Sequence, residues 1–147
     1  MSSPAFIRVP FREMYNTFET ILLRNGFAED NAKTCAHVFA TNSLEGIYTH
    51  GVNRFPKFIQ YCQESYVKID AEPSRVHHFG GMEQWDGNLG PGVLNALRST
   101  DRAMELASEH GIGCVALANT NHWMRGGYYG WQAAKKGFVF IGSRTKS

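Results

Sequence analysis

The sequence predicts an α+β fold, with a helical N-terminal part followed by a mixed β-sheet with flanking helices. Two observations support this prediction. Apolar residues recur every three or four positions as far as Ser65, which is helical spacing. After that point, short β-prone runs bounded by glycines alternate with helical segments. We therefore divide the chain into a helical segment, residues 1–70, and the first part of a mixed α/β domain, residues 71–147.

Three helices are expected in the N-terminal segment. The first covers FREMYNTFETILLRNG, where Gly26 is placed to end it, and the second covers EDNAKTCAHVFATNSLEG, where Gly46 ends it. A third helix is expected from about Val52 to Ser65. Pro56 falls in its first turn, where the missing N–H group costs little because it has no partner in the helix.

The second part alternates strands and helices. The run SRVHHFGGMEQWDG predicts a hairpin or two short strands, and GPGVLNALRSTDRAMELASEHG predicts a helix. The apolar run IGCVALAN predicts a buried strand, RGGYYGWQAAKKG another helix, and FVFIGS a last strand that ends at Gly142. A buried strand so close to the end of the chain needs neighbouring strands, so we expect the domain to be incomplete.

The composition limits the classes of function. Hydrophobic residues make up 43% of the chain and charged residues 19%, as in globular proteins, and the net charge of +2 is too small and dispersed to favour nucleic acid or an anionic membrane as a partner. No apolar run reaches membrane-spanning length and no signal peptide is evident, which predicts a soluble cytoplasmic protein. Cys35, Cys62 and Cys114 form no CxxC pair and are expected to be reduced, buried thiols.

His50 is the first candidate site residue, in the run YTHGVNRFP. It lies at the expected start of the third helix, where free N–H groups and the helix dipole favour an anion. Arg54 can grip a carboxylate with two hydrogen bonds, and a histidine can give a proton to a carbonyl oxygen and take it back. Together they suit a 2-oxo or 2-hydroxy acid. The alternative is that His50 caps the helix and Arg54 is a solvated surface residue.

His122 is the second candidate, in NTNHWMRGGYYGW, directly after the apolar strand and before a helix. Ligand sites in α/β proteins often lie at the carboxyl ends of strands, and Gly126 and Gly127 would let the backbone approach a ligand. The segment is not a GxGxxG fingerprint of a Rossmann fold. The alternative is a tight turn from strand to helix, in which His122 bonds to the backbone.

Other motifs carry weaker signals. The glycine-rich run GNLGPG lacks the Lys-Ser/Thr of a phosphate-binding loop, which favours a simple turn with Pro91 near the start of a helix. His77 and His78 would point to opposite faces of a strand, so no metal site is predicted. His37 and His110 are expected on helix surfaces, and the carboxylates of EQWD and TDRAME on solvated faces.

Several long blocks in the same order carry a family resemblance: YTHGVNRFPKFIQ, GNLGPGVLNALRSTDRAMELASEHGIGCVAL and NTNHWMRGGYYGWQAAKKGFVFIG. They resemble the malate/L-lactate dehydrogenase family that lacks a classical Rossmann fold. The resemblance implies an α+β fold of the L-sulfolactate dehydrogenase type and an NAD(P)H-dependent reduction of a 2-oxo acid to a 2-hydroxy acid, usually by a homodimer. It implies that His50 or His122 is the catalytic proton donor and that Arg54 binds the substrate carboxylate. The family's substrates include malate, lactate, sulfolactate, ureidoglycolate and diketogulonate.

Two features depart from the family pattern. The chain reads SRTKS where members have a tryptophan-threonine-asparagine type of segment, and known members are more than twice as long. The resemblance implies that most cofactor-binding residues, which stay unassigned here, belong to the absent part. We therefore expect a truncated N-terminal piece of the enzyme or one product of a split gene. The alternatives are an inactive remnant or interaction fragment that pairs with a full-length relative, and a carboxylate binder without a cofactor.

Overall fold

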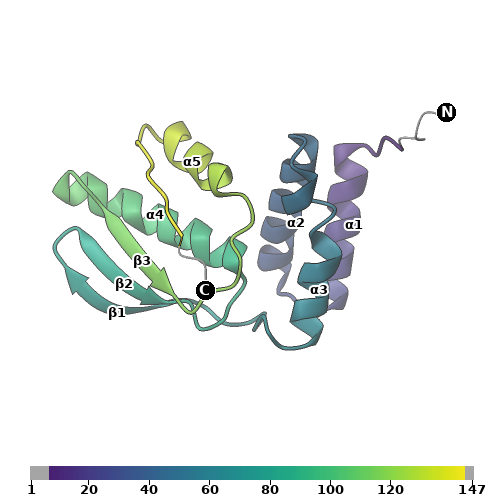
Figure 1. Ribbon diagram of the computed structural model, residues 1–147, viewed down its shortest axis with the longest axis horizontal. Helices are drawn as coiled ribbons and strands as arrows, with labels where there is room; N and C mark the ends of the chain where they lie inside the picture. Colours follow the sequence, from purple (N-terminus) through teal and green to yellow (C-terminus); the bar gives the residue numbers. More distant parts are fainter. Residues whose placement is uncertain (1–6, 145–147) are drawn as a thin grey trace.

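A computed structural model describes residues 7–144 and confirms the α+β class. Figure 1 shows three N-terminal helices on one side and a small sheet with two further helices on the other. The elements follow in the order α1 (Phe11–Arg24), α2 (Glu29–Leu44), the 3-10 turn η1 (Tyr48–His50), α3 (Phe55–Gln63), β1 (Ser74–Phe79), β2 (Met82–Asp86), α4 (Gly92–His110), β3 (Cys114–Ala118) and α5 (Gly126–Lys135).

An aromatic cluster holds the three N-terminal helices together. The rings of Phe18 in α1 and Phe55 in α3 stack with their centroids 4.1 Å apart, and Phe39 of α2 meets Phe55 edge-on at 5.1 Å. All three side chains are at most 5% exposed. Burying a phenylalanine stabilises a fold by about 1.5–3 kcal/mol, so these contacts account for much of the cohesion of the bundle.

The same core reaches across to the second part of the chain. Val93 and Leu94, at the start of α4, and Met124, in the loop after β3, belong to the buried cluster that α1, α2 and α3 form. This shared core brings the start of α4 and the loop after β3 to the three-helix bundle. The division into two domains at residue 70 stays a prediction.

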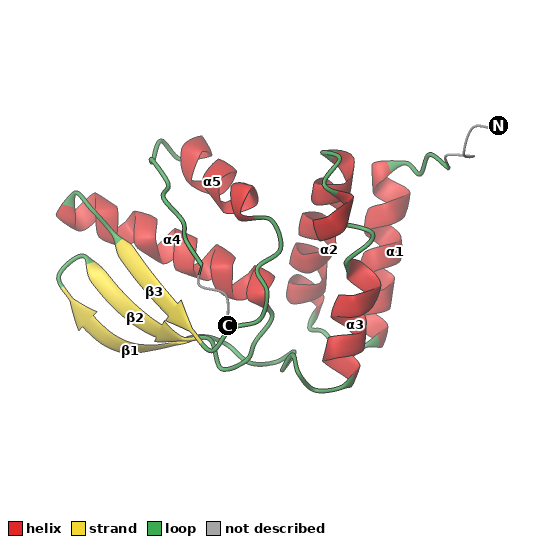
Figure 2. Cartoon of the chain, viewed as in Figure 1, coloured by secondary structure: helices red, strands yellow, loops and turns green. Residues whose placement is uncertain are grey.

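The sheet has the strand order β1-β2-β3. The predicted hairpin is confirmed, because β1 and β2 pair antiparallel, with a register shift between Arg75 and His77. β2 and β3 pair in parallel, which requires a crossover, and α4 provides it. Figure 2 shows α4 and α5 on one side of the sheet. The β2 side chains alternate accordingly: Glu83 is buried and Met82 and Gln84 are exposed.

The run IGCVALAN forms the predicted strand β3, but the prediction that it is buried is wrong. Along the strand, exposed residues alternate with half-buried ones. β3 pairs only with β2 among the described residues, so its other edge is free. The prediction of three buried thiols is confirmed for Cys35 but wrong for Cys114 in β3, which is exposed, and for Cys62 in α3, which is half-buried.

Two further element predictions need correction. The third helix begins at Phe55 rather than near Val52, because Gly51 to Arg54 form turns in which the carbonyl oxygen of Gly51 accepts from the N–H groups of Arg54 and Phe55. The run FVFIGS is not a strand in the described residues. Val139 and Ile141 are 93% and 94% exposed, so this apolar run has no covering partner within the part of the chain that the structure describes.

Glu83 is not on a solvated face, which corrects a further prediction. It is 2% exposed and lies between β2 and α4, where Arg102 donates to Oε1 from Nε at 3.2 Å and from Nη2 at 2.9 Å. Arg75 also donates to Oε1, and Trp85 donates to Oε2 at 2.8 Å. These bonds lower the pKa of Glu83 to about 2, the Arg102 bonds most. Within residues 7–144, no helix has the length and apolarity that a membrane crossing requires.

Candidate active site

His50 ends the short turn η1, between the end of α2 and the start of α3. It is therefore not inside the helix that follows, and Arg54 takes the N-cap position of that helix instead. The ring of His50 is partly exposed, and its Nδ1 lies 3.0 Å from the hydroxyl of Thr49. This contact leaves Nε2 available to a ligand.

The last turn of α2 holds the backbone around His50. Asn42, which is fully buried, donates from Nδ2 to the carbonyl oxygen of His50 at 3.0 Å. The hydroxyl of Ser43 accepts from the N–H of Val52 at 2.8 Å and donates to the carbonyl oxygen of Phe39 at 2.9 Å. Gly51 packs closely against Ser43, which is possible only because glycine lacks a side chain. A Cβ at residue 51 would lie 2.3 Å from the hydroxyl oxygen of Ser43.

His122 lies in the loop that joins β3 to α5. The loop contains two non-glycine residues with positive φ, Asn119 at 48° and Met124 at 64°, a backbone conformation that the surrounding contacts must hold. The N–H of Met124 donates to Nδ1 of His122 at 2.9 Å. Because Nδ1 accepts this bond, the neutral ring carries its proton on Nε2, which can donate to a ligand oxygen.

The structure brings the candidate residues together from two distant segments. The rings of His50 and His122 lie with their centroids 5.6 Å apart. Burial first, and then the positive charges of Arg144, Arg54 and His50, lower the pKa of His122 from 6.5 to about 4. His122 is therefore neutral at pH 7. Of the alternative in which His50 caps the helix and Arg54 is a solvated surface residue, the first part is wrong, because Arg54 takes the N-cap position of α3. The side chain of Arg54 is half-buried.

An ion pair connects the end of α2, before the His50 turn, with the start of α5, after the His122 loop. The guanidinium of Arg125, the N-cap residue of α5, pairs with the carboxylate of Glu45 at the end of α2. The contact joins the element after His122 to the element before His50. Both of these side chains are partly exposed, so the pair contributes to the arrangement more than to stability.

The glycine-rich turn GNLGPG is filled by the protein itself. A Cβ on Gly87 would meet the side chain of Asn95 at 2.8 Å, and one on Gly90 would meet the carbonyl oxygen of Ala71 at 2.7 Å. Pro91 is the N-cap residue of α4, as the sequence predicts. The described residues consequently offer no open glycine cradle for the phosphates of a dinucleotide at this turn.

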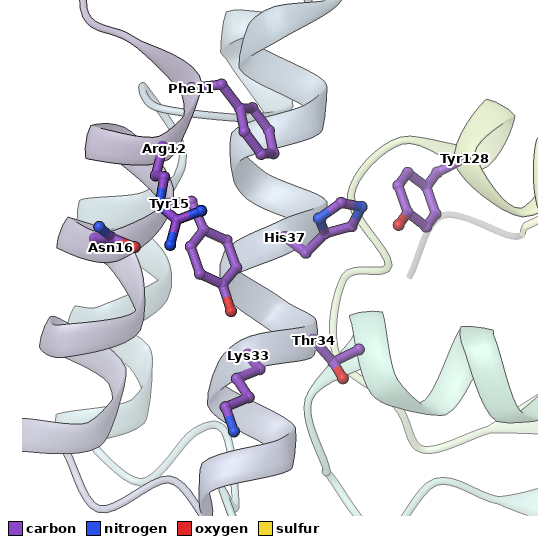
Figure 3. A pocket seen from close by; sticks show the side chains of 8 residues that line it. All are labelled: Phe11, Arg12, Tyr15, Asn16, Lys33, Thr34, His37 and Tyr128. Atoms are coloured by element: carbon purple, nitrogen blue, oxygen red, sulfur yellow. The ribbon is translucent and has the colours of Figure 1, made fainter.

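A groove of about 560 Å³ lies elsewhere, between α1, α2 and the start of α5 (Figure 3). His37 and Tyr128 face each other across it, and Arg12 and Lys33 add positive charge. His37 is exposed, as predicted. The groove contains none of the three predicted site residues, so it is separate from the candidate active site. Its lining residues are Phe11, Arg12, Tyr15, Asn16, Lys33, Thr34, His37 and Tyr128.

Comparison with known proteins identifies the family of this chain and agrees with its fold. The sequence profile of the family described as malate/L-lactate dehydrogenase matches residues 9–146. The chain belongs to this family. The 2,3-diketo-L-gulonate reductases of Salmonella schwarzengrund and Klebsiella pneumoniae are 51% and 50% identical to it over 135 residues. These alignments cover 92% of this chain and 41% of each relative, so the chain spans less than half the length of these curated relatives.

Solved structures of the family have the same fold. The malate dehydrogenase of Pyrococcus horikoshii superposes with a TM-score of 0.86 at 29% identity, covering 89% of this chain and 38% of that one. The sulfolactate dehydrogenase of Methanocaldococcus jannaschii gives a TM-score of 0.85 at 27% identity, covering 88% and 38%. The predicted sulfolactate dehydrogenase type of fold is thereby confirmed.

The sequence analysis did not identify two buried polar residues that bond to the loops of the candidate site. Asn42 and Asn95 are both fully buried, and each bonds to a loop near one of the two histidines. The signal was present for Asn42, because it lies three residues after Phe39 on the face of α2 that carries the apolar core. A buried polar side chain on such a face needs a hydrogen-bond partner, but periodicity alone does not show which residue that partner is.

Proposed function

We propose that this protein takes part in the NAD(P)H-dependent reduction of a 2-oxo acid of the 2,3-diketo-L-gulonate type to the 2-hydroxy acid. The observation that carries the proposal is the meeting of His50, His122 and the charge of Arg54 in one place. These groups supply what a small organic acid needs: a cation for its carboxylate, a neutral donor for its carbonyl oxygen and a second imidazole that can carry a proton.

Each residue has a distinct part in the proposal. Arg54 holds the carboxylate of the acid with its planar guanidinium, which fixes the position of the neighbouring carbonyl group. His122, neutral and protonated on Nε2, donates a hydrogen bond to the 2-oxo oxygen and orients it. His50, whose ring is partly exposed, gives its proton to that oxygen as the carbonyl becomes a hydroxyl group.

The reduced nicotinamide supplies the hydride to C2 when it is bound, in the NADH or NADPH form. Most of the residues that hold it are proposed to lie outside the described residues, and the glycine-rich turn GNLGPG is not among the candidates because protein atoms fill it. The proposed steps therefore concern only the binding of the acid and the position of its proton.

We further propose a homodimer, or an association with the polypeptide that corresponds to the rest of the family's length, as the working form. The support is the exposure of apolar side chains just before β3 and after α5: Ile112 is 79% exposed, Val139 93% and Ile141 94%. Large apolar side chains that gather in water are typical of interaction sites. A cytoplasmic location fits the three cysteines, which are free.

The same exposed residues favour a second candidate function, a non-catalytic subunit that pairs with a full-length relative. The purified chain distinguishes the two. We expect NADH or NADPH to be consumed with 2,3-diketogulonate, pyruvate or oxaloacetate, either by the chain alone or after mixing with the rest of the family fold, and His50→Ala to abolish this turnover. Binding to a full-length relative without any turnover of its own would support the second function instead.

A further inference from the structure

Two buried asparagines lie behind the two candidate histidines. Asn42, near the end of α2, donates to the carbonyl oxygen of His50 at 3.0 Å. Asn95, in the first turn of α4, donates to the carbonyl oxygen of Gly87 and to the hydroxyl of Thr120, both at 2.9 Å. Thr120 lies two residues before His122. Both asparagines are 0% exposed, so each acts from the protein interior on a loop that carries a site residue.

Stability alone does not favour asparagine at these positions. The Oδ1 atoms of Asn42 and Asn95 are buried and have no hydrogen-bond partner among the described residues. A buried acceptor without a partner is unfavourable, and an apolar side chain of similar volume would avoid that cost. Thr100 of α4 is a contrasting case, because its buried hydroxyl bonds only to Ala96 in its own helix. The two asparagine amides instead bond to loops outside their helices.

Neighbouring contacts make each attachment specific. On the first loop, Ser43 accepts from the N–H of Val52, so the backbone is held on both sides of Gly51. On the second loop, Asn121 donates from Nδ2 to the carbonyl oxygens of Leu89 and Gly90 at 2.7 and 3.2 Å. The backbone at and after His50 and the backbone before His122 are therefore each held by a buried asparagine amide and by a second polar side chain.

We propose that Asn42 and Asn95 are positioning residues that set the separation of the His50 and His122 rings. The inference rests on the proposed function for its purpose, but its geometry stands on the contacts alone. The two histidines come from distant segments of the chain, one after the end of α2 and one after the end of β3. A shift of either loop changes their separation, and a reacting carbonyl needs both groups within hydrogen-bond reach.

The test uses Asn42→Leu and Asn95→Leu in the full chain, with Thr100→Val as the matched control, since it removes a buried polar group that holds no loop. The first readout is the nuclear Overhauser effect between the ring protons of His50 and His122. We expect it to weaken at least about threefold in both asparagine variants and to be unchanged in the control, because the effect falls steeply with separation. The second readout is the dissociation constant for pyruvate, which we expect to rise about tenfold.

The outcomes separate the two proposals. Loss of the ring-to-ring effect in folded variants, with no pyruvate binding even by the unaltered chain, supports the positioning role and overturns the proposed function. Folded variants that keep both the effect and the affinity overturn the positioning role. If the leucine variants do not fold, Thr120→Val removes the contact of Asn95 with the His122 loop and leaves both asparagines in place. Ser43→Ala is its control, because it keeps the bond of Asn42 to the His50 carbonyl oxygen. A ring-to-ring effect that Thr120→Val leaves unchanged also overturns the inference.

Discussion

Gly92 lies directly against the backbone that carries His122. A Cβ at Gly92 would be 2.1 Å from the carbonyl oxygen of Asn121 and 2.5 Å from that of His122. The start of α4 and the loop after β3 are therefore in contact through main-chain atoms, at a distance that only glycine permits. The position of His122 depends on this contact as well as on the loop itself.

Gly92→Ala should displace the His122 loop. The added methyl group meets backbone rather than a flexible side chain, so the loop must move, and we expect a loss of roughly 1–3 kcal/mol in the free energy of unfolding. Urea unfolding measures the loss, and amide shifts across residues 119–125 report the displacement. Gly130→Ala in α5 is the control, because its nearest neighbour would be at an ordinary 3.7 Å. Equal effects of both substitutions would contradict the argument.

His122 should remain neutral down to pH values near 4. Its folded pKa of about 4 lies below the ordinary value of 6.5, so between these values the unfolded chain binds more protons than the folded one. Stability is therefore expected to fall as the pH drops from 6.5 to 4, and His122→Gln should flatten that part of the profile. Nitrogen chemical shifts of the ring measure both the pKa and the Nε2–H tautomer. A ring that titrates near 6.5 would show that His122 is not buried beside these positive charges in solution.

Arg54→Lys should weaken the binding of a 2-oxo acid. An ammonium group keeps the charge but cannot form the two parallel hydrogen bonds of a guanidinium, so we expect the dissociation constant for pyruvate, or KM in the active assembly, to rise about tenfold. Calorimetric titration gives the constant. Arg12→Lys, in the separate groove, is the matched control and should leave it unchanged. Equal affinities in both variants would remove Arg54 from the site.

Glu83→Gln should destabilise the packing of α4 against the sheet. The variant keeps the shape of the side chain but loses the charge that Arg102 and Arg75 face, at a cost of roughly 1–3 kcal/mol. Glu72→Gln is the control, because Glu72 is 71% exposed in its pair with Arg98 and such pairs contribute little. Denaturant unfolding of both variants measures the difference.

The acid dependence gives Glu83 a second signature. Its folded pKa of about 2 lies below the ordinary 4.5, so its contribution to stability is present above pH 4.5 and is lost as the pH falls towards 2. The unaltered chain should lose more stability over this range than Glu83→Gln does. Parallel pH profiles for the two proteins would mean that the carboxylate is not ionised in the folded state.

Substitution of the exposed apolar run should reduce self-association. Val139→Lys with Ile141→Lys places two charges where the chain now exposes two apolar side chains, and we expect sedimentation velocity to show less association. Tyr66→Lys, at a position after α3 that is 63% exposed, should have a smaller effect. Unchanged association would place the contact surface on another part of the chain.

Local patterns in the sequence predicted much of this structure. Helical periodicity placed α1, α2, α4 and α5, and glycine-bounded runs placed the hairpin, because both signals depend on residues close together in the chain. His50, Arg54 and His122 were chosen from the chemistry of their side chains and from their places beside predicted helices and strands. The structure adds that they lie together, which is a long-range property that no local pattern contains.

The wrong predictions of burial share one cause. Periodicity shows that a run is apolar but not what covers it, so β3 and the run from Phe138 onward were expected to be buried, although Val139 is almost fully exposed. Glu83 was expected on a solvated face because it is charged. Its partner Arg102 comes from α4, a helix that the local sequence around Glu83 does not reveal. Burial of single residues depends on packing between distant segments, which one sequence read locally does not supply.

The free edge of β3 has a consequence for how a cell could keep this chain in solution. Among the described residues β3 pairs only with β2, and a strand with one unpaired side offers a row of N–H and C=O groups to any extended peptide that reaches it, including a neighbouring nascent copy. Chaperone demand should accordingly fall when a polypeptide able to complete the sheet is produced at the same time.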